Sequence, residues 1–160
     1  MEIERKYLVK KEKWAILDKP PSDKITQGYL STDINKTIRV RIKNSSAWMT
    51  VKGKTHNYSR EEIEFEIPLA KAEELLNKFT GNIIEKKRYV LKYKGKKWEV
   101  DEFLGVNEGL ILAEIELKNE EEEFELPEWI DKEVSNDYRY YNSFLSENPI
   151  NIIDRINKYL

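Results

Sequence analysis

The N-terminus of the chain shows a regular alternation of charged and apolar side chains. Glu2, Glu4 and Lys6 occupy alternate positions, while Ile3, Arg5 and Tyr7 lie in the other set. Because successive side chains of an extended strand point to opposite faces, we expect two carboxylates and one ammonium group on the same face. This alternation predicts a β-strand that is polar on one side and apolar on the other.

Three later segments repeat the alternation. Basic side chains alternate with apolar ones in residues 37–43, and acidic side chains do so in residues 60–67 and 111–117. An ordinary antiparallel sheet with its charges in water has the same pattern. Here, however, the charges are sorted into basic rows and acidic rows, which indicates that the polar faces have a function of their own.

The periodicity and its breaks predict eight strands and four helices. Turn-like breaks at 44–46 and 94–96 indicate hairpins. The expected strands are 2–9, 25–30, 37–43, 47–53, 59–67, 83–94, 97–104 and 110–118. The expected helices are a short one at 12–18, one that begins at Pro68 and ends at Gly81, one capped by Ser135 or Asn136 with Tyr138, Tyr141 and Leu145, and one that opens at Pro149 with Ile150, Ile153, Ile156 and Leu160 on a stripe.

Together these elements predict a single α+β domain over residues 1–160, made mainly of antiparallel β-structure. If the apolar faces of the strands met, they would form a sandwich with the charges outside. If they turned outward under the helices, the charges would line the lumen of a barrel, and eight strands enclose a space for one small ligand. Charged side chains inside a lumen need ion-pair partners, water or metal, so the function would depend on what the lumen contains.

Composition excludes several classes of function. Although 36% of the residues are charged, the formal net charge is only −2, which argues against nucleic acid bound on a broadly basic surface. The chain has no cysteine, so a disulfide framework and a thiolate metal site are excluded. The only histidine, His56, lies in an expected loop. No apolar run approaches the ~18 residues of a membrane span, so we expect a cytoplasmic protein without a membrane partner.

In the barrel arrangement, the charges of the acidic and basic side chains that point inward nearly cancel, so the lumen could form without its ligand. The inward acids would be Glu2, Glu4, Glu62, Glu64, Glu99, Asp101, Glu114 and Glu116, and the inward bases Lys6, Arg39, Arg41, Lys52, Arg60, Lys86 and Arg88. Clustered carboxylates favour a divalent cation, and an all-oxygen site suits Mg²⁺ or Mn²⁺ better than zinc. Because arginine and lysine on facing strands suit phosphate, we expect a polyanionic phosphate ligand.

The order of these motifs resembles the CYTH domain, also called the triphosphate tunnel metalloenzyme superfamily. The similarity runs from residue 2 to about residue 145. It rests on Glu2-x-Glu4-x-Lys6, Gln27-Gly28-Tyr29-Leu30, Ile38-Arg39-Val40-Arg41, Thr50-Val51-Lys52-Gly53, Glu62-Ile63-Glu64, Lys86-Lys87-Arg88-Tyr89, Trp98-Glu99-Val100-Asp101, Ala113-Glu114-Ile115-Glu116 and Arg139-Tyr140-Tyr141-Asn142. The resemblance implies an eight-stranded closed antiparallel tunnel with a charged lumen, a triphosphate bound inside and a required divalent metal.

Carried over residue by residue, the resemblance implies three groups of site residues. The metal-binding acids would be Glu2, Glu4, Asp101, Glu114 and Glu116. The triphosphate clamp would be Lys6, Arg39, Arg41, Lys52, Lys86 and Arg88. Glu62 and Glu64, with Lys6, are expected at the reacting centre, where the two acids would bind a second metal, position water or hold the clamp arginines. Glu99 and Arg60 are either members of the site or paired structural charges.

The function that the resemblance implies is metal-dependent hydrolysis of a linear triphosphate. Our primary hypothesis is cleavage of inorganic tripolyphosphate to pyrophosphate and phosphate by a monomer or homodimer. The enzymatic alternatives are a class IV adenylate cyclase and a thiamine or nucleoside triphosphatase. The alternative from another class is a noncatalytic polyphosphate sensor, against which the retained acids count, because a pure anion binder would gain affinity by losing them.

Overall fold

A computed structural model of the chain describes residues 1–150, and ten β-strands make up nearly half of this range. The strands are β1 (Glu2–Val9), β2 (Asp23–Asp33), β3 (Lys36–Lys43), β4 (Ser46–Gly53), β5 (Ser59–Arg60), β6 (Glu62–Ile67), β7 (Ile84–Tyr93), β8 (Lys96–Phe103), β9 (Ile111–Glu116) and β10 (Ile130–Glu133). The helices are α1 (Lys11–Ile16), α2 (Leu69–Phe79) and α3 (Asn142–Glu147), with 3₁₀ segments η1 (Gly105–Asn107) and η2 (Tyr138–Tyr140). The helix predicted to open at Pro149 falls mainly on 151–160, outside the described residues.

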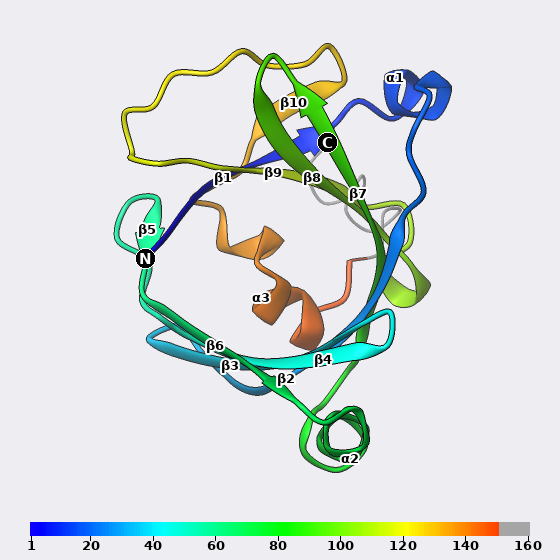
Figure 1. Ribbon diagram of the computed structural model, residues 1–160, viewed down its shortest axis with the longest axis vertical. Coiled ribbons are helices and arrows are strands. Elements are labelled where there is room, and N and C mark those ends of the chain that lie inside the picture. Colours follow the sequence, from blue (N-terminus) through cyan, green and yellow to red (C-terminus); the bar gives the residue numbers. More distant parts are fainter. Residues whose placement is uncertain (151–160) are drawn as a thin grey trace.

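The strands form one strongly curled antiparallel sheet in the order β10-β1-β9-β8-β7-β2-β3-β4-β6 (Figure 1). No ladder joins β6 directly to β1 in the described range. Instead β5 pairs with β1, where Glu2 lies opposite Arg60, and only Glu61 separates β5 from β6. The sheet therefore surrounds a lumen, as expected, but the gap between β6 and β1 is bridged by the two-residue strand β5. The predicted strand 59–67 is two strands because the segment changes partner at Glu61, from β1 to β4.

Hairpins connect several neighbouring strands, and both predicted turns are confirmed. The β3–β4 turn contains Asn44 with a φ of 56°, and the β7–β8 turn contains Lys94 and Gly95 with φ values of 48° and 77°. In the β7–β8 turn, two successive residues with positive φ give the turn a twist that matches the twist of the flanking strands. The sequence did not predict β10, which is four residues long and pairs only with β1.

The apolar faces of the strands point outward, beneath helices and loops. On one flank Tyr7, Trp98 and Ile115 form a core with Trp14 of α1 and Trp129 of the long connection after β9. Burial of several large aromatic rings supplies most of the driving force for this layer. The tunnel prediction is therefore correct in its central feature, and the sandwich alternative is wrong.

On the opposite flank α2 covers the outer face of β2, β3 and β4 (Figure 1). Ala72 and Leu76 face Val40, and a close approach at Gly28 of β2 makes room for the end of the helix. A Cβ atom on Gly28 would lie 2.9 Å from the Thr80 hydroxyl oxygen, which is closer than real side chains come. Glycine at this position therefore lets the helix and the strand pack together.

The inward face of the sheet changes from charged to apolar along β7, β8 and β9. Ile84, Phe103 and Leu112 share the inward parity of the charged rows and pack against Tyr140 of η2 and Leu145 of α3. In Figure 1, η2 and α3 lie inside the ring of strands. The C-terminal part of the described chain thus provides an apolar floor beneath the charged part of the lumen.

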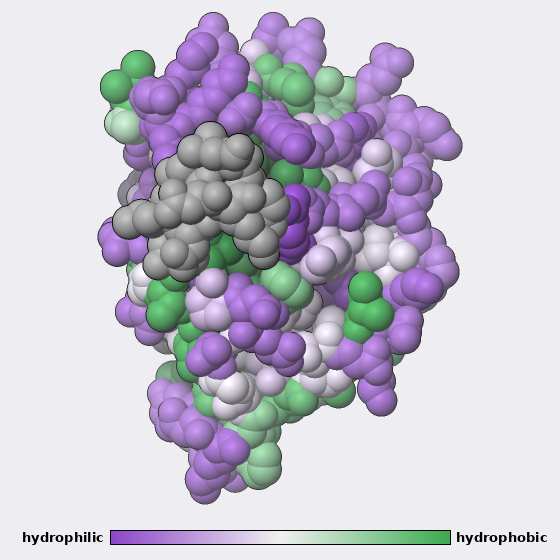
Figure 2. Space-filling view, turned by 180° about the vertical axis from the view of Figure 1, so that it is seen from behind, coloured by the Kyte–Doolittle hydropathy of each residue, from purple (hydrophilic) through white to green (hydrophobic). Residues whose placement is uncertain are grey.

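The outer surface is dominated by polar residues. Seen from behind, hydrophilic side chains cover most of the visible face and hydrophobic ones form separate groups (Figure 2). Within residues 1–150, no helix has the length and apolar character that crossing a membrane requires.

Candidate active site

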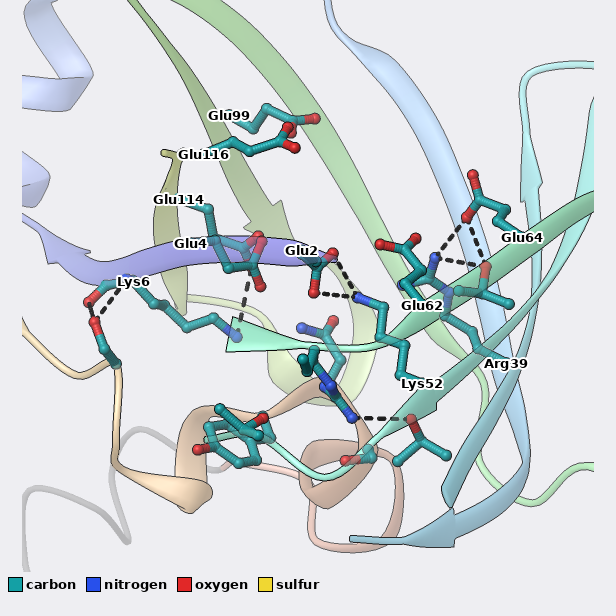
Figure 3. A pocket seen from close by; sticks show the side chains of 18 of the residues that line it. Glu2, Glu4, Lys6, Arg39, Lys52, Glu62, Glu64, Glu99, Glu114 and Glu116 are labelled. Atoms are coloured by element: carbon teal, nitrogen blue, oxygen red, sulfur yellow. Dashed lines mark hydrogen bonds and ion pairs between the residues drawn. The ribbon is translucent and has the colours of Figure 1, made fainter. Parts of the chain in front are cut away.

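The inward side chains of the curled sheet enclose a cavity of about 350 Å³, a volume suited to a small ligand. All of the predicted inward acids and bases except Asp101 line this cavity. They are Glu2, Glu4, Glu62, Glu64, Glu99, Glu114, Glu116, Lys6, Arg39, Arg41, Lys52, Arg60, Lys86 and Arg88. Figure 3 shows ten of them converging from facing strands.

Strand register explains how the acids meet. In the β1–β9 ladder Glu4 lies opposite Glu116 and Lys6 opposite Glu114, and in the β8–β9 ladder Glu99 lies opposite Glu114. Directly opposed residues of an antiparallel pair have their side chains about 5 Å apart on the same face. The alternation seen in the sequence therefore becomes a patch of acids across three adjacent strands.

The carboxylates of this patch repel one another. Burial, with the charges of Glu114 and Glu2, raises the pKa of Glu4 well above its ordinary value. Burial opposes ionisation of Glu114 as well, but Lys6 and Arg88 lower the pKa of Glu114 to about 2. Lys6 Nζ lies 3.5 Å from the Glu114 carboxylate. A further cation beside Glu4 would relieve the remaining repulsion.

The donor set of the patch fits a hard divalent cation in its chemistry. The available ligands are carboxylate oxygens, which Mg²⁺ and Mn²⁺ prefer. Across the described part of the chain, no three Asp, Glu or His side chains are already arranged as a metal site. The acids therefore share one cavity without a preassembled coordination shell, and the metal assignment remains a prediction.

Basic side chains from β3, β4 and β7 occupy the rest of the lining. Lys52 Nζ donates to both carboxylate oxygens of Glu2 at 2.9 and 3.0 Å. Arg39 Nη2 donates to Thr50 Oγ1 at 3.1 Å and to Glu64 Oε2 at 3.4 Å. Its buried Nε has no hydrogen-bond partner among the described residues. Because a buried unsatisfied donor costs about 1–3 kcal/mol, this group has a strong tendency to bind an acceptor.

Arg41 lines the cavity without a carboxylate partner among the described residues. Its Nε donates to the neutral amide oxygen of Gln27 at 2.8 Å, and it forms no ion pair with an acid in residues 1–150. Burial, with the positive charges of Arg39 and Arg88, lowers the pKa of Arg41 to about 9. The environment of Arg41 therefore favours an anionic ligand.

Asp101 lies behind the lining rather than in it. It accepts hydrogen bonds from Arg88 Nε at 2.8 Å and Nη2 at 2.9 Å, and Lys86 Nζ lies 2.8 Å away. Burial opposes its ionisation, but Lys86 and Arg88 lower the pKa of Asp101 far below its usual range. Its role as a metal ligand stays a prediction, and the observed contacts favour a role in holding two clamp cations.

The remaining predicted residues differ in how they are held. Glu62 is opposite Lys52 in the β4–β6 ladder, and burial, followed by the charge of Glu2, raises the pKa of Glu62. Arg60 donates to the Gly53 carbonyl oxygen at 3.1 Å and to Thr37 Oγ1 at 3.2 Å. In a separate contact, Glu99 accepts from Arg88 Nη1 at 3.0 Å.

Several uncharged residues complete the site and were not assigned roles from the sequence. They include Tyr29, Thr50, Ser135, Tyr141 and Asn142 in the lining, and Gln27 behind it. Gln27 has the inward parity of β2, which is a usable signal. Asn142 begins a short helix, and nothing in its local sequence indicates that it lies inside the sheet.

Comparisons with known proteins agree with this architecture. The model of the CYTH domain matches residues 1–145. An "Inorganic triphosphatase" of Acetivibrio thermocellus is 46% identical over 149 residues, which are 92% of this chain and 94% of that protein. A protein of the same name from Nitrosomonas europaea is 35% identical over 149 residues, covering 91% and 96% of the two chains. The crystal structure of the inorganic triphosphatase NE1496 matches with a TM-score of 0.66 at 33% identity, covering 91% of this chain and 94% of that one.

Proposed function

The chain belongs to the CYTH domain family, and on that premise we propose that it is a triphosphatase that hydrolyses inorganic tripolyphosphate to pyrophosphate and phosphate. Relatives that resemble it over almost their whole length carry the name inorganic triphosphatase. The acids and bases of the cavity are of the types that this reaction requires.

One observation carries the proposal: two guanidinium groups of the cavity lining have hydrogen-bonding capacity or charge that no carboxylate in residues 1–150 satisfies. Arg39 Nε has no hydrogen-bond partner among the residues described, and Arg41 contacts a neutral amide rather than a carboxylate. Guanidinium groups match phosphate oxygens in geometry and charge. Phosphates of a linear triphosphate would satisfy both arginines.

We assign Mg²⁺ or Mn²⁺ to the acidic side of the cavity. Glu4 and Glu114 would hold the ion, with Glu2 and Glu116 in the same lining. When bound, the ion neutralises negative charge on the phosphate oxygens. This assignment follows from the oxygen-only donor set and from the repulsion around Glu4.

The chain's own residues have distinct tasks in this proposal. Arg39 and Arg41 bind phosphate oxygens and stabilise charge that develops on the leaving pyrophosphate. Lys6, beside Glu114, lies where the acidic patch meets the bases and would contact the same substrate. Since Glu64 already accepts from Arg39 and Thr50, Glu62 is better placed to orient the attacking water.

A metal and substrate panel tests the function. Purified protein with Mg²⁺ or Mn²⁺ should release phosphate from tripolyphosphate, and Glu4→Gln or Glu116→Gln should lower turnover by at least about 100-fold, because each removes a charge from the acidic patch. Unchanged turnover in both variants would refute the metal assignment. Cyclic AMP formed from ATP would identify a cyclase instead, and tight tripolyphosphate binding without turnover would identify a sensor.

A further inference from the structure

Two neutral amides contact each other at the basic side of the cavity, Asn142 in its lining and Gln27 behind it. Gln27 of β2 has an exposed fraction of 0% and lies opposite Arg41 in the β2–β3 ladder. Its Nε2 donates to Oδ1 of Asn142, the first residue of α3, at 3.1 Å. A buried amide is normally retained only where its hydrogen bonds are satisfied, so Gln27 has a defined task.

Each amide contacts one cation of the proposed clamp. Arg41 Nε donates to Gln27 Oε1 at 2.8 Å, and Lys86 Nζ donates to Asn142 Oδ1 at 2.9 Å. Since arginine and lysine can only donate, both amide oxygens must face the cations. The Gln27 NH₂ group is then directed to Asn142, and the four side chains form one continuous chain of hydrogen bonds.

Arg41 and Lys86 differ from two other clamp cations in the carboxylates that they contact. Lys52 contacts the carboxylate of Glu2, and Arg88 contacts those of Glu99 and Asp101. Arg41 has no carboxylate partner within residues 1–150, and Lys86 shares Asp101 with Arg88. An amide fixes a cation through its dipole, whereas a carboxylate also cancels its charge.

We propose that Gln27 and Asn142 are positioning residues of the triphosphate site, which hold Arg41 and Lys86 in place through neutral acceptors. Arg41 then keeps its positive charge available to phosphate, and among the described residues Lys86 is neutralised only by Asp101, which it shares with Arg88. The proposal rests on the function proposed above. It also gives a task to η2 and α3, because Lys6 Nζ donates to the Tyr140 carbonyl oxygen at 3.3 Å. Neutral groups of the 140–142 segment thus contact two clamp lysines.

Charge-changing and apolar variants of the same position separate positioning from ordinary structural support. Gln27→Glu and Asn142→Asp keep an acceptor oxygen but add a negative charge beside the cation. Gln27→Met keeps the size but removes the hydrogen bonds. Asn107→Asp is the matched control, because Asn107 is also a buried amide but accepts from the Ile150 backbone, away from the clamp.

The measurements are the Kd for tripolyphosphate by calorimetry in EDTA, the KM with Mg²⁺, and the thermal midpoint. We expect Gln27→Glu and Asn142→Asp to weaken binding by about tenfold or more. Gln27→Met should weaken binding less but lower the midpoint more, because Arg41 then loses the hydrogen bond to Gln27 and gains no charge to compensate. The control should lower the midpoint and leave Kd within twofold.

The opposite order of effects on the Kd, with Gln27→Met weakening binding more than Gln27→Glu, would overturn the proposal. A purely structural amide predicts that Gln27→Glu, which pairs with Arg41, binds like the wild type while Gln27→Met does not. If Gln27→Met does not fold, wild-type Kd and KM values in both carboxylate variants are sufficient to reject the proposal. Failure of the wild type itself to bind or hydrolyse tripolyphosphate would instead reject the proposed function, and the positioning role with it.

Discussion

Replacement of Asp101 by asparagine should destabilise the metal-free protein strongly. Asp101 is 3% exposed and contacts Arg88 through two hydrogen bonds and Lys86 through one ion pair, all between 2.8 and 2.9 Å. Asp101→Asn preserves the shape but leaves two buried cations without this counter-charge. Removal of one partner from a buried ion pair costs about 3–5 kcal/mol, a large part of the roughly 5–15 kcal/mol that stabilises a domain.

Urea unfolding in EDTA, followed by tryptophan fluorescence, measures this effect. With a slope of about 2 kcal/mol per molar urea, the midpoint should fall by roughly 1.5–2.5 M. Asp131→Asn, at an exposed position of β10, is the control and should change the free energy of unfolding by no more than about 0.5 kcal/mol.

The same experiment decides between two roles for Asp101. An aspartate that only ligates metal would leave metal-free stability unchanged, so a midpoint within about 0.3 M of the wild type, at the slope used above, would refute our argument. Saturating tripolyphosphate should restore part of the loss, since a ligand at 100 times its Kd contributes about 2.7 kcal/mol. Stabilisation by Mg²⁺ that appears in the wild type and is missing from Asp101→Asn would favour the metal role.

Two further predictions concern stability. Hydrogen bonding to Arg5 lowers the pKa of Glu133, so this contact should stabilise the fold above the ordinary carboxylate pKa and lose its effect as pH falls through the lowered pKa. Thermal melts should show wild type exceeding Glu133→Gln by about 1 kcal/mol at pH 7 and by progressively less as the pH is lowered through the acid range; a constant difference would contradict the linkage. Gly28→Ala should cost about 1–3 kcal/mol in urea unfolding because its Cβ would crowd Thr80, while Gly81→Ala, with open space around it, should be close to neutral.

Side-chain parity made most of the cavity lining predictable. A strand alternates its faces with a fixed period of two, so Arg39 and Arg41, or Glu114 and Glu116, must point the same way wherever the strand lies. Parity does not specify depth along the lumen. Asp101 has the predicted inward direction, but it lies toward the apolar floor and contacts cations behind the lining.

Features that depend on distant segments were not predictable in this way. The partner change at Glu61 and the short strand β10 depend on where the sheet curls, which no local pattern records. The contact between Gln27 and Asn142 joins residues 115 positions apart. A sequence pattern identifies which face a residue occupies, but not which remote residue covers it.

The insertion of η2 and α3 into the ring of strands has a consequence for the order of events in folding. Lys6 meets the Tyr140 carbonyl across a separation of 134 residues, so nearly the whole chain must be synthesised before the floor can form. Closing such long loops costs entropy before any contact repays it, which makes these contacts late ones. Hydrolytic competence should therefore be acquired at the last folding step, and nascent chains that end before α3 should be inactive even when their hairpins have already formed.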